Sequence, residues 1–238
     1  MKSLTERTLL HLHIEAVWGV RLPSITQSDI TLLPESQQPS WKLCAAEIAG
    51  ERVHIWRIGV DAIEREELLT SAYEALTLPP TAAAAEGINR DIALHQVAPP
   101  TLDVKAAQLI AYPLARHHEK LLESFQPGSA EYFLHPNCRP LIGVIVEGRL
   151  LSLAHSSRRT SEACELGIDT LPEARRRGYA LAATILWAAT VSLEGLVPLY
   201  STSVENEASL GLAAAAGYRV FAKVVTVEGQ REIKKLEH

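Results

Sequence analysis

Residues 166–193 constrain the fold more than any other part of the chain, because a short turn there joins an extended apolar stretch to a long helical run. Residues 166–170 have the composition of a strand, and a turn that contains Pro172 follows them. The Ala/Leu-rich stretch from Gly178 to Leu193 predicts a helix. A helix that begins directly after a strand and a glycine-bearing turn presents free backbone N–H groups and the positive end of its dipole. The segment therefore predicts an anion site.

The residues around the helix start suit a diphosphate. Three arginines add positive charge, Gly178 lets a bulky phosphate approach the backbone, and the small Ala180 keeps a second gap open. We predict a pyrophosphate cradle built mainly from backbone N–H groups. Its residues are Arg175, Arg176, Arg177, Gly178, Tyr179 and Ala180.

The spacing Arg175-x-x-Gly178-x-Ala180 resembles the acyl-CoA signature of the GNAT acyltransferase superfamily. A second stretch is similar to the family at the expected separation, with a predicted strand over 196–202, a helix start that contains Asn206 and Ser209, and the pair Gly217-Tyr218 after that helix. The resemblance covers roughly residues 140–225. It implies an α+β fold with a mixed α/β sheet, in which the C-terminal half forms the GNAT acyl-CoA core.

The resemblance also implies an activity, which is transfer of the acetyl group of acetyl-CoA to a primary amine by direct attack in a ternary complex. Main-chain atoms of Ile168, Asp169 and Thr170 would pair with the pantetheine arm of this co-substrate. Asn206 and Ser209 would lie beside coenzyme A. Both are also ordinary helix-start residues, since Asn is a common N-cap and Ser209 lies three residues after it.

Three residues are candidates for proton transfer. Glu165 begins the strand that leads into the cradle, near where many GNAT members have a carboxylate, and a base is needed because alkyl amines are protonated at neutral pH. His155 ends the neighbouring predicted strand, and histidine titrates in the right range. Tyr200 is a candidate acid, because Ala213 stands where the family often has a tyrosine that protonates the leaving thiolate. The alternatives are a solvated carboxylate, a packed histidine and a packed tyrosine.

The cysteines and histidines predict no metal site. The three cysteines are odd in number and lack metal or redox spacing, and the pairs His117-His118 and His11-x-His13 have no companions at ligand spacing. Cys164 invites an acyl-cysteine intermediate, but no cationic residue or histidine adjoins it in the sequence, so a buried apolar role is favoured. We therefore expect no metal, and a reducing cytoplasm as the location.

Composition limits the partners. The net charge of −5 argues against bulk nucleic-acid binding, since no lysine-rich face is evident. No apolar run approaches the length of a membrane span and no leader-like segment opens the chain, so no membrane partner is expected. The expected acceptor is a small-molecule or peptide amine. A homodimer stays open, because GNAT proteins are frequently dimers.

The pair Pro99-Pro100 is the best candidate for a domain boundary. We predict an N-terminal α/β region of unknown role over 1–100, a GNAT catalytic domain over 101–235, and a tag remnant over 236–238. The first region contains a predicted strand over 9–20, a hairpin over 41–60 and a helix from Asp61 to about Leu76. The second contains a predicted helix over 116–125, a hairpin over 139–156 and a strand over 165–169.

Two other functions compete with acyl transfer. A non-catalytic acyl-CoA-binding or sensing protein of the same fold is motivated by Ala213 and by the uncertain base. A Rossmann-type nucleotide binder is disfavoured, because the cradle follows a meander of strands and lacks the Gly-x-Gly-x-x-Gly pattern.

Overall fold

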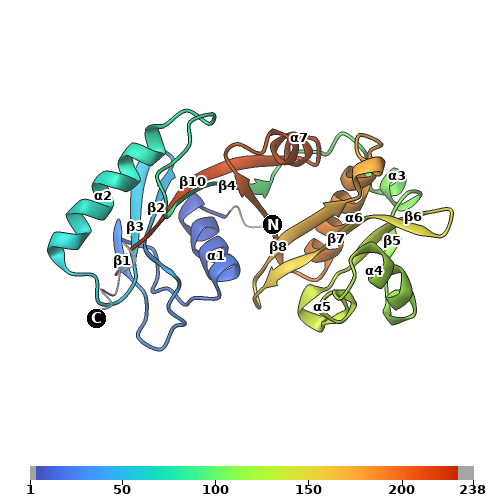
Figure 1. Cartoon of the computed structure of the whole chain (residues 1–238), viewed down its shortest axis with the longest axis horizontal. Coiled ribbons are helices and arrows are strands. Elements are labelled where there is room, and N and C mark those ends of the chain that lie inside the picture. Colours follow the sequence, from blue (N-terminus) through green and yellow to red (C-terminus); the bar gives the residue numbers. More distant parts are fainter. Residues whose placement is uncertain (1–3, 230–238) are drawn as a thin grey trace, which may run out of the picture.

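Among the residues that the structure describes, stretches rich in Val, Ile and other apolar residues form ten strands that pair into one mixed sheet with helices on both faces (Figure 1). The computed structural model describes residues 4–229. The strands are β1 (Asp29–Thr31), β2 (Trp41–Ile48), β3 (Glu51–Trp56), β4 (Ile88–Gln96), β5 (Tyr112–Pro113), β6 (Ile142–Val146), β7 (Arg149–Arg159), β8 (Ala163–Thr170), β9 (Val197–Ser203) and β10 (Tyr218–Glu228). The helices are α1 (Glu6–Trp18), α2 (Ala62–Thr77), α3 (Val104–Gln108), α4 (Glu119–Phe125), α5 (Ala130–Leu134), α6 (Tyr179–Leu193) and α7 (Glu207–Ala215), with 3-10 helices η1 (Arg116–His118), η2 (Pro136–Cys138) and η3 (Pro172–Ala174). The predicted α+β fold class is confirmed.

The two halves of the chain share this sheet. Neighbouring strands follow the order β1-β3-β2-β10-β4-β9-β8-β7-β6-β5. β1 runs parallel to β3 and β8 runs parallel to β9, whereas the other neighbours are antiparallel. Strand β4 comes from the first hundred residues, yet it lies between β9 and β10 from the end of the chain. The division at about residue 100 stays a prediction, and any such boundary follows a central strand of the common sheet.

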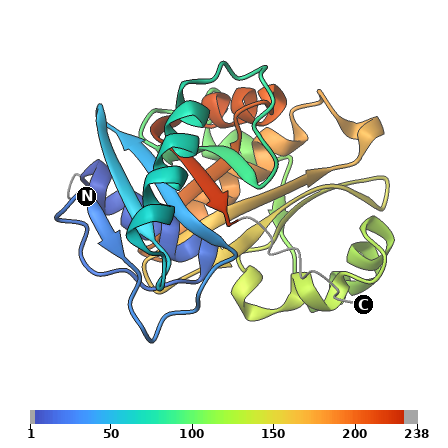
Figure 2. The same ribbon diagram turned by 60° about the vertical axis from the view of Figure 1, so that its left-hand side comes forward.

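Each face of the sheet has its own core, because alternate residues of a strand point to opposite faces. Leu10 and Ile14 of α1 pack with Leu199 on one face, while Trp187 of α6 packs with Cys164 on the other. Helices α4 and α5 lie on the α1 face, and α2, α3 and α7 lie on the α6 face. Figure 2 shows α2 lying across β2 and β10.

The strand predicted over 9–20 is wrong, because residues 6–18 form α1. The alternation of Leu, His, Leu, His and Ile over residues 10–14 imitates a strand. Both Leu12 and its neighbour His13 are buried, however, so the alternation does not separate a buried face from an exposed one. Two caps fix the helix ends. The Thr5 side chain accepts from the N–H of Thr8, and Gly19 adopts φ 63° at the C-terminus.

The other N-terminal predictions hold with small shifts. The hairpin is β2 and β3, and it ends at Trp56 instead of residue 60. The helix is α2, capped by the Asp61 side chain, which accepts from the N–H of Glu64. No strand is predicted over 88–96, where β4 lies.

The elements predicted in the C-terminal half are confirmed in their order as a hairpin of β6 and β7, then β8, α6, β9 and α7, and β10 follows them. The helix predicted over 116–125 is η1 followed by α4. The tag remnant predicted over 236–238 lies outside the described residues.

Candidate functional site

Strands β8 and β9 pair over only part of their length. Their parallel register runs from Ala163 opposite Val197 to Glu165 opposite Leu199. Both strands continue beyond this point, β8 to Thr170 and β9 to Ser203, without further pairing between them. Beyond Glu165, the edge of β8 that faces β9 is therefore free to pair with another extended chain.

The hydrogen bonds between β7 and β8 identify the residues that face this free edge. The Leu171 N–H donates to the Leu151 carbonyl at 3.0 Å, one step beyond the register pair of Thr170 and Ser152. Because main-chain groups alternate between the two edges of a strand, Ile168 and Thr170 direct theirs away from β7. The Asp169 carbonyl lies on the β7 side and accepts from the Ser152 hydroxyl at 3.1 Å.

The predicted cradle forms a tight turn at the start of α6. Arg176 and Gly178 both have left-handed backbones, with φ 58° and φ 78°. The first helical hydrogen bond runs from the Ala182 N–H to the Gly178 carbonyl at 3.0 Å, so the amides of residues 179–181 make no bond within the helix. The three predicted arginines are exposed around this turn. The arrangement is suited to an anion.

A buried polar cluster lies where β8 and β9 separate, on the face that α1 covers. Glu165 is 4% exposed and His13 of α1 is 2% exposed. The His13 Nδ1 lies 3.6 Å from Glu165 Oε2, which is within ion-pair distance and beyond a hydrogen bond. Asp91 of β4 belongs to the same neighbourhood. Burial raises the pKa of Asp91, with the charge of His13 opposing and that of Glu165 adding to the rise.

Tyr200, Asn206 and Ser209 form one hydrogen-bonded group at the start of α7. The Tyr200 hydroxyl lies 2.5 Å from the Ser209 hydroxyl, and the Asn206 side-chain oxygen accepts from the Ser209 N–H at 3.0 Å. Burial raises the pKa of Tyr200, while its hydrogen bond with Ser209 opposes this rise and the Glu165 charge adds to it. The predicted capping role of Asn206 is confirmed, and its amide nitrogen can still donate to a ligand.

His155 lies in an aromatic setting beside the cluster. It faces Gly167 in the β7–β8 register, so it is diagonal to Glu165 at a Cα separation of about 7–8 Å. Its ring contacts the rings of Tyr132 and Phe133 edge-on. Burial lowers the pKa of His155, so its imidazole is neutral at pH 7. Packing explains this histidine, and the proton-transfer role stays a prediction.

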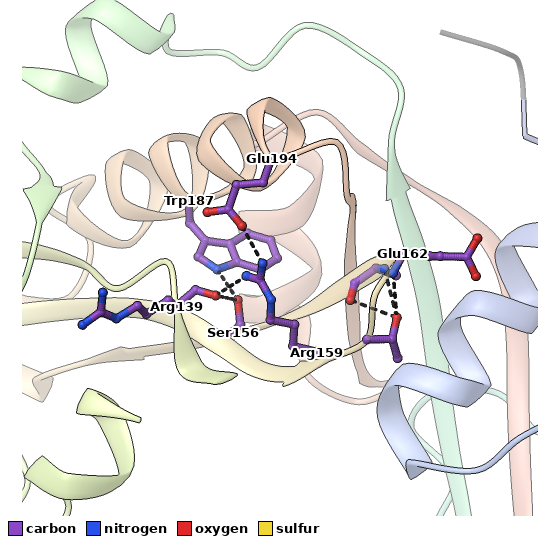
Figure 3. A network of polar contacts seen from close by, with 8 residues as sticks. Arg139, Ser156, Arg159, Glu162, Trp187 and Glu194 are labelled. Carbon is purple, nitrogen blue, oxygen red and sulfur yellow. Dashed lines mark hydrogen bonds and ion pairs between the residues drawn. The ribbon is translucent and has the colours of Figure 1, made fainter. Parts of the chain in front are cut away.

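An ion pair and hydrogen bonds fix the end of β7 against the C-terminal end of α6 (Figure 3). Arg159 pairs with Glu194 at 2.7 Å and donates to the Arg139 carbonyl at 2.8 Å. The Ser156 hydroxyl donates to the same carbonyl at 2.7 Å and accepts from Trp187 Nε1 at 3.3 Å. Since α6 spans 15 residues, this network lies about 20 Å from the cradle and has a structural role.

The cysteines are buried and free. Burial raises the pKa of the Cys164 thiol, so the structure gives no support to an acyl-cysteine intermediate. Within residues 4–229 there is no group of three or more side chains that could hold a metal ion. No helix in this described part of the chain is long and apolar enough to cross a membrane.

A model of the GNAT acetyltransferase family matches residues 140–225. These residues are similar to that family, and we call the matched stretch the GNAT domain. The match spans the β6–β7 hairpin, the free edge of β8, the cradle, the start of α7 and most of β10. A GNAT domain is a fold that supports acyl transfer from acetyl-CoA in general. No curated protein matches the chain.

Solved structures with GNAT descriptions are similar to the chain at low identity. A putative acetyltransferase from Novosphingobium aromaticivorans has 21% identity and a TM-score of 0.48, with 61% of this chain and 68% of that chain covered. A GNAT acetyltransferase from Colwellia psychrerythraea has 15% identity and a TM-score of 0.49, with 74% and 75% covered. A GCN5-related N-acetyltransferase-like protein from Streptococcus suis has 14% identity and a TM-score of 0.48, with 87% and 82% covered.

The fold brings residues from outside the GNAT domain to the site. Helix α1 supplies His13, and β4 supplies Asp91 beside β9. Sequence reasoning does not identify Asp91, and it considers His13 only in the pair His11-x-His13, which it sets aside as a metal site. A polar residue within the buried run of α1 is a signal, but it is visible only once residues 6–18 are recognised as a helix.

Proposed function

We propose that the protein is an N-acyltransferase that transfers an acyl group, acetyl in the first place, from acetyl-CoA to a primary amine in a ternary complex. One observation carries the proposal: the free edge of β8 leads directly into a helix start whose first amides make no bond within the helix. An extended pantetheine arm needs an unpaired strand edge, and a diphosphate needs such a helix start.

In the proposed complex the cradle amides and exposed arginines hold the diphosphate. Main-chain groups of Ile168 and Thr170 pair with the pantetheine arm, because they face the free edge. A backbone N–H of β8 polarises the thioester carbonyl. Asn206 donates from its amide nitrogen to the co-substrate, while its oxygen keeps the cap of α7.

Glu165 is the proposed base. It accepts a proton from the substrate ammonium, and the neutral nitrogen then forms a bond to the thioester carbonyl carbon. The C–S bond breaks as the tetrahedral intermediate collapses, and the sulfur takes the second proton of the nitrogen to give free coenzyme A. The proton on Glu165 then leaves to solvent. Carboxylates of Glu165 and Asp91 in one neighbourhood also favour a cationic acceptor.

Tyr200 is the proposed relay for this second proton: its hydroxyl donates a proton to the departing sulfur and takes up the one that leaves the nitrogen. Its raised pKa keeps the hydroxyl protonated at neutral pH, and Ser209 orients it. Ala213 of α7 is fully buried and has no ionisable group, so it takes no part in this step.

Thiol release from acetyl-CoA, measured with a panel of small-molecule and peptide amines, tests the proposal. We expect amine-dependent release that falls about 100- to 10,000-fold in Glu165→Gln, the usual effect of losing a general base. Glu162→Gln is the matched control, because this exposed glutamate lies just before β8. Release that is equal in both variants would exclude Glu165 as the base.

A non-catalytic acyl-CoA-binding protein of the same fold is the second candidate, favoured by the burial of Glu165 under α1 and by Ala213. The same assay separates the two candidates, since such a protein binds acetyl-CoA and releases no thiol with any amine. For location we propose the cytoplasm, supported by buried, free cysteines. A homodimer is also a proposal, which light scattering would test.

A further inference from the structure

Glu165 and His13 are two buried ionisable groups that face one another without completing a hydrogen bond. Their Nδ1 and Oε2 atoms lie 3.6 Å apart. Among the described residues, neither the His13 Nδ1 nor either carboxylate oxygen of Glu165 has a hydrogen-bond partner. A buried carboxylate without a partner costs several kcal/mol, so this pair is what compensates Glu165 in the folded chain.

The residues packed around His13 leave little room for another group to compensate the charge of Glu165. Its ring packs edge-on against Phe221 of β10 at a centroid distance of 6.1 Å. Helix α1 contacts β7, β8 and β10, so His13 is enclosed by the sheet. From β4, Asp91 faces the pair, and its raised pKa, caused first by burial, reflects the charges of both His13 and Glu165.

The remaining ionisable groups around the pair come from four elements. From β9 and β10, Tyr200 and Tyr218 are buried, and burial followed by the Glu165 charge raises the pKa of Tyr218. On α1 itself, His11 pairs with Glu15 at 3.3 Å, and both side chains are partly exposed. From β7, Arg158 lies opposite Glu165 in register with an exposed side chain, and His155 lies on the diagonal and is neutral.

We propose that His13 is a positioning residue for Glu165, whose Nδ1–H orients the Glu165 carboxylate. The inference rests on the proposed function, in which Glu165 is the base. It gives the N-terminal region a part in the chemistry, because His13 lies outside the GNAT domain. Hydrogen bonds between catalytic groups are often long in the absence of ligand and shorten in the substrate complex, so the distance from His13 Nδ1 to Glu165 Oε2 is compatible with this role.

A double-mutant cycle with His13→Gln and Glu165→Gln tests this role. We expect His13→Gln to lower kcat about 10- to 100-fold and to leave the KM for acetyl-CoA within about twofold, because the base loses its orientation while the contacts to the co-substrate stay. In the Glu165→Gln background the same change should cost less than about twofold, because the group it positions is gone. His11→Gln is the matched control on the same helix and should leave kcat unchanged.

A measurement on the free protein tests the pairing of His13 with Glu165 without relying on turnover or on the folding of the His13 variant. NMR of the imidazole nitrogens at one fixed pH should detect a proton on the His13 Nδ1 of the wild-type protein and a changed Nδ1 resonance in Glu165→Gln, because the facing carboxylate is gone. An equal loss from His13→Gln in both backgrounds, or an Nδ1 resonance of His13 that is the same in Glu165→Gln as in the wild type, would overturn the inference. If the wild-type protein releases no thiol with any amine, the proposed function fails, while the NMR result still decides the pairing.

Discussion

Replacing Gly178 with glutamate probes the cradle directly. Gly178 has φ +78°, and a Cβ built there meets no heavy atom within 4 Å. The substitution therefore costs the strain of a left-handed residue, about 1–2 kcal/mol, without a clash. The new carboxylate lies at a helix N-terminus, where the helix dipole offsets about 0.3–1 kcal/mol of this cost. The net loss of about 1 kcal/mol should lower Tm by about 2–4 °C.

The same change should be severe for the co-substrate. Two unit negative charges 4 Å apart repel by about 4 kcal/mol at an effective dielectric of 20, which is about a thousandfold in Kd. Calorimetry with coenzyme A should therefore show Kd rising about 100- to 1,000-fold in Gly178→Glu, since salt screens part of the repulsion.

Gly195→Glu is the matched control. Gly195 has φ +81° and equally open surroundings, but it follows the opposite end of α6, about 25 Å away. It carries the same strain and charge, so its Tm should fall by at least as much while coenzyme A binds as in the wild type. Equal affinity for coenzyme A in the two glutamate variants would refute the cradle.

Three further predictions concern stability. Burial raises the pKa of Asp91 above its ordinary 3.8, so the folded chain holds this proton more tightly, and the free energy of unfolding falls as pH rises from about 3.8 through the raised value. Urea unfolding of Asp91→Asn should lack this fall, and identical pH dependence in the two proteins would contradict the assignment. Burial lowers the pKa of His155, so stability should be lost as pH falls below about 6.5, and His155→Gln should lose less over that range. A Cβ at Gly167 would overlap the His155 ring, so Gly167→Ala should cost about 1–3 kcal/mol, and an unchanged denaturation midpoint would count against this packing.

Local signals made the turn before α6 and the helix start at Gly178 predictable. The turn with Pro172, the glycine at the helix start and the Ala/Leu-rich run all lie within about twenty residues. Each of them sets the backbone conformation of its own segment. The Asp61 cap of α2 is predictable for the same reason. Elements of this kind need no tertiary contact to be recognised.

Long-range packing decides what the sequence does not reveal. Residues 88–96 form β4 because β9 and β10 flank them, although Asn89, Arg90 and Asp91 make the strand start polar. The Arg90 guanidinium is buried here because it donates to the carbonyls of Leu78 and Ala82. No pattern within residues 88–96 predicts which strands lie beside β4 or that Arg90 is buried. The contact of His13 with Glu165 joins residues about 150 positions apart, so it emerges only from the folded chain.

A crystal structure of the protein with coenzyme A tests the central claim most directly. The account predicts the diphosphate on the amides of residues 179–181 and the sulfur between β8 and β9, beside Glu165. A cavity of about 710 Å³ lies near the other end of α6 and includes Glu6, His95 and Ser192. Coenzyme A bound in that cavity, with the free edge of β8 unoccupied, would contradict the account.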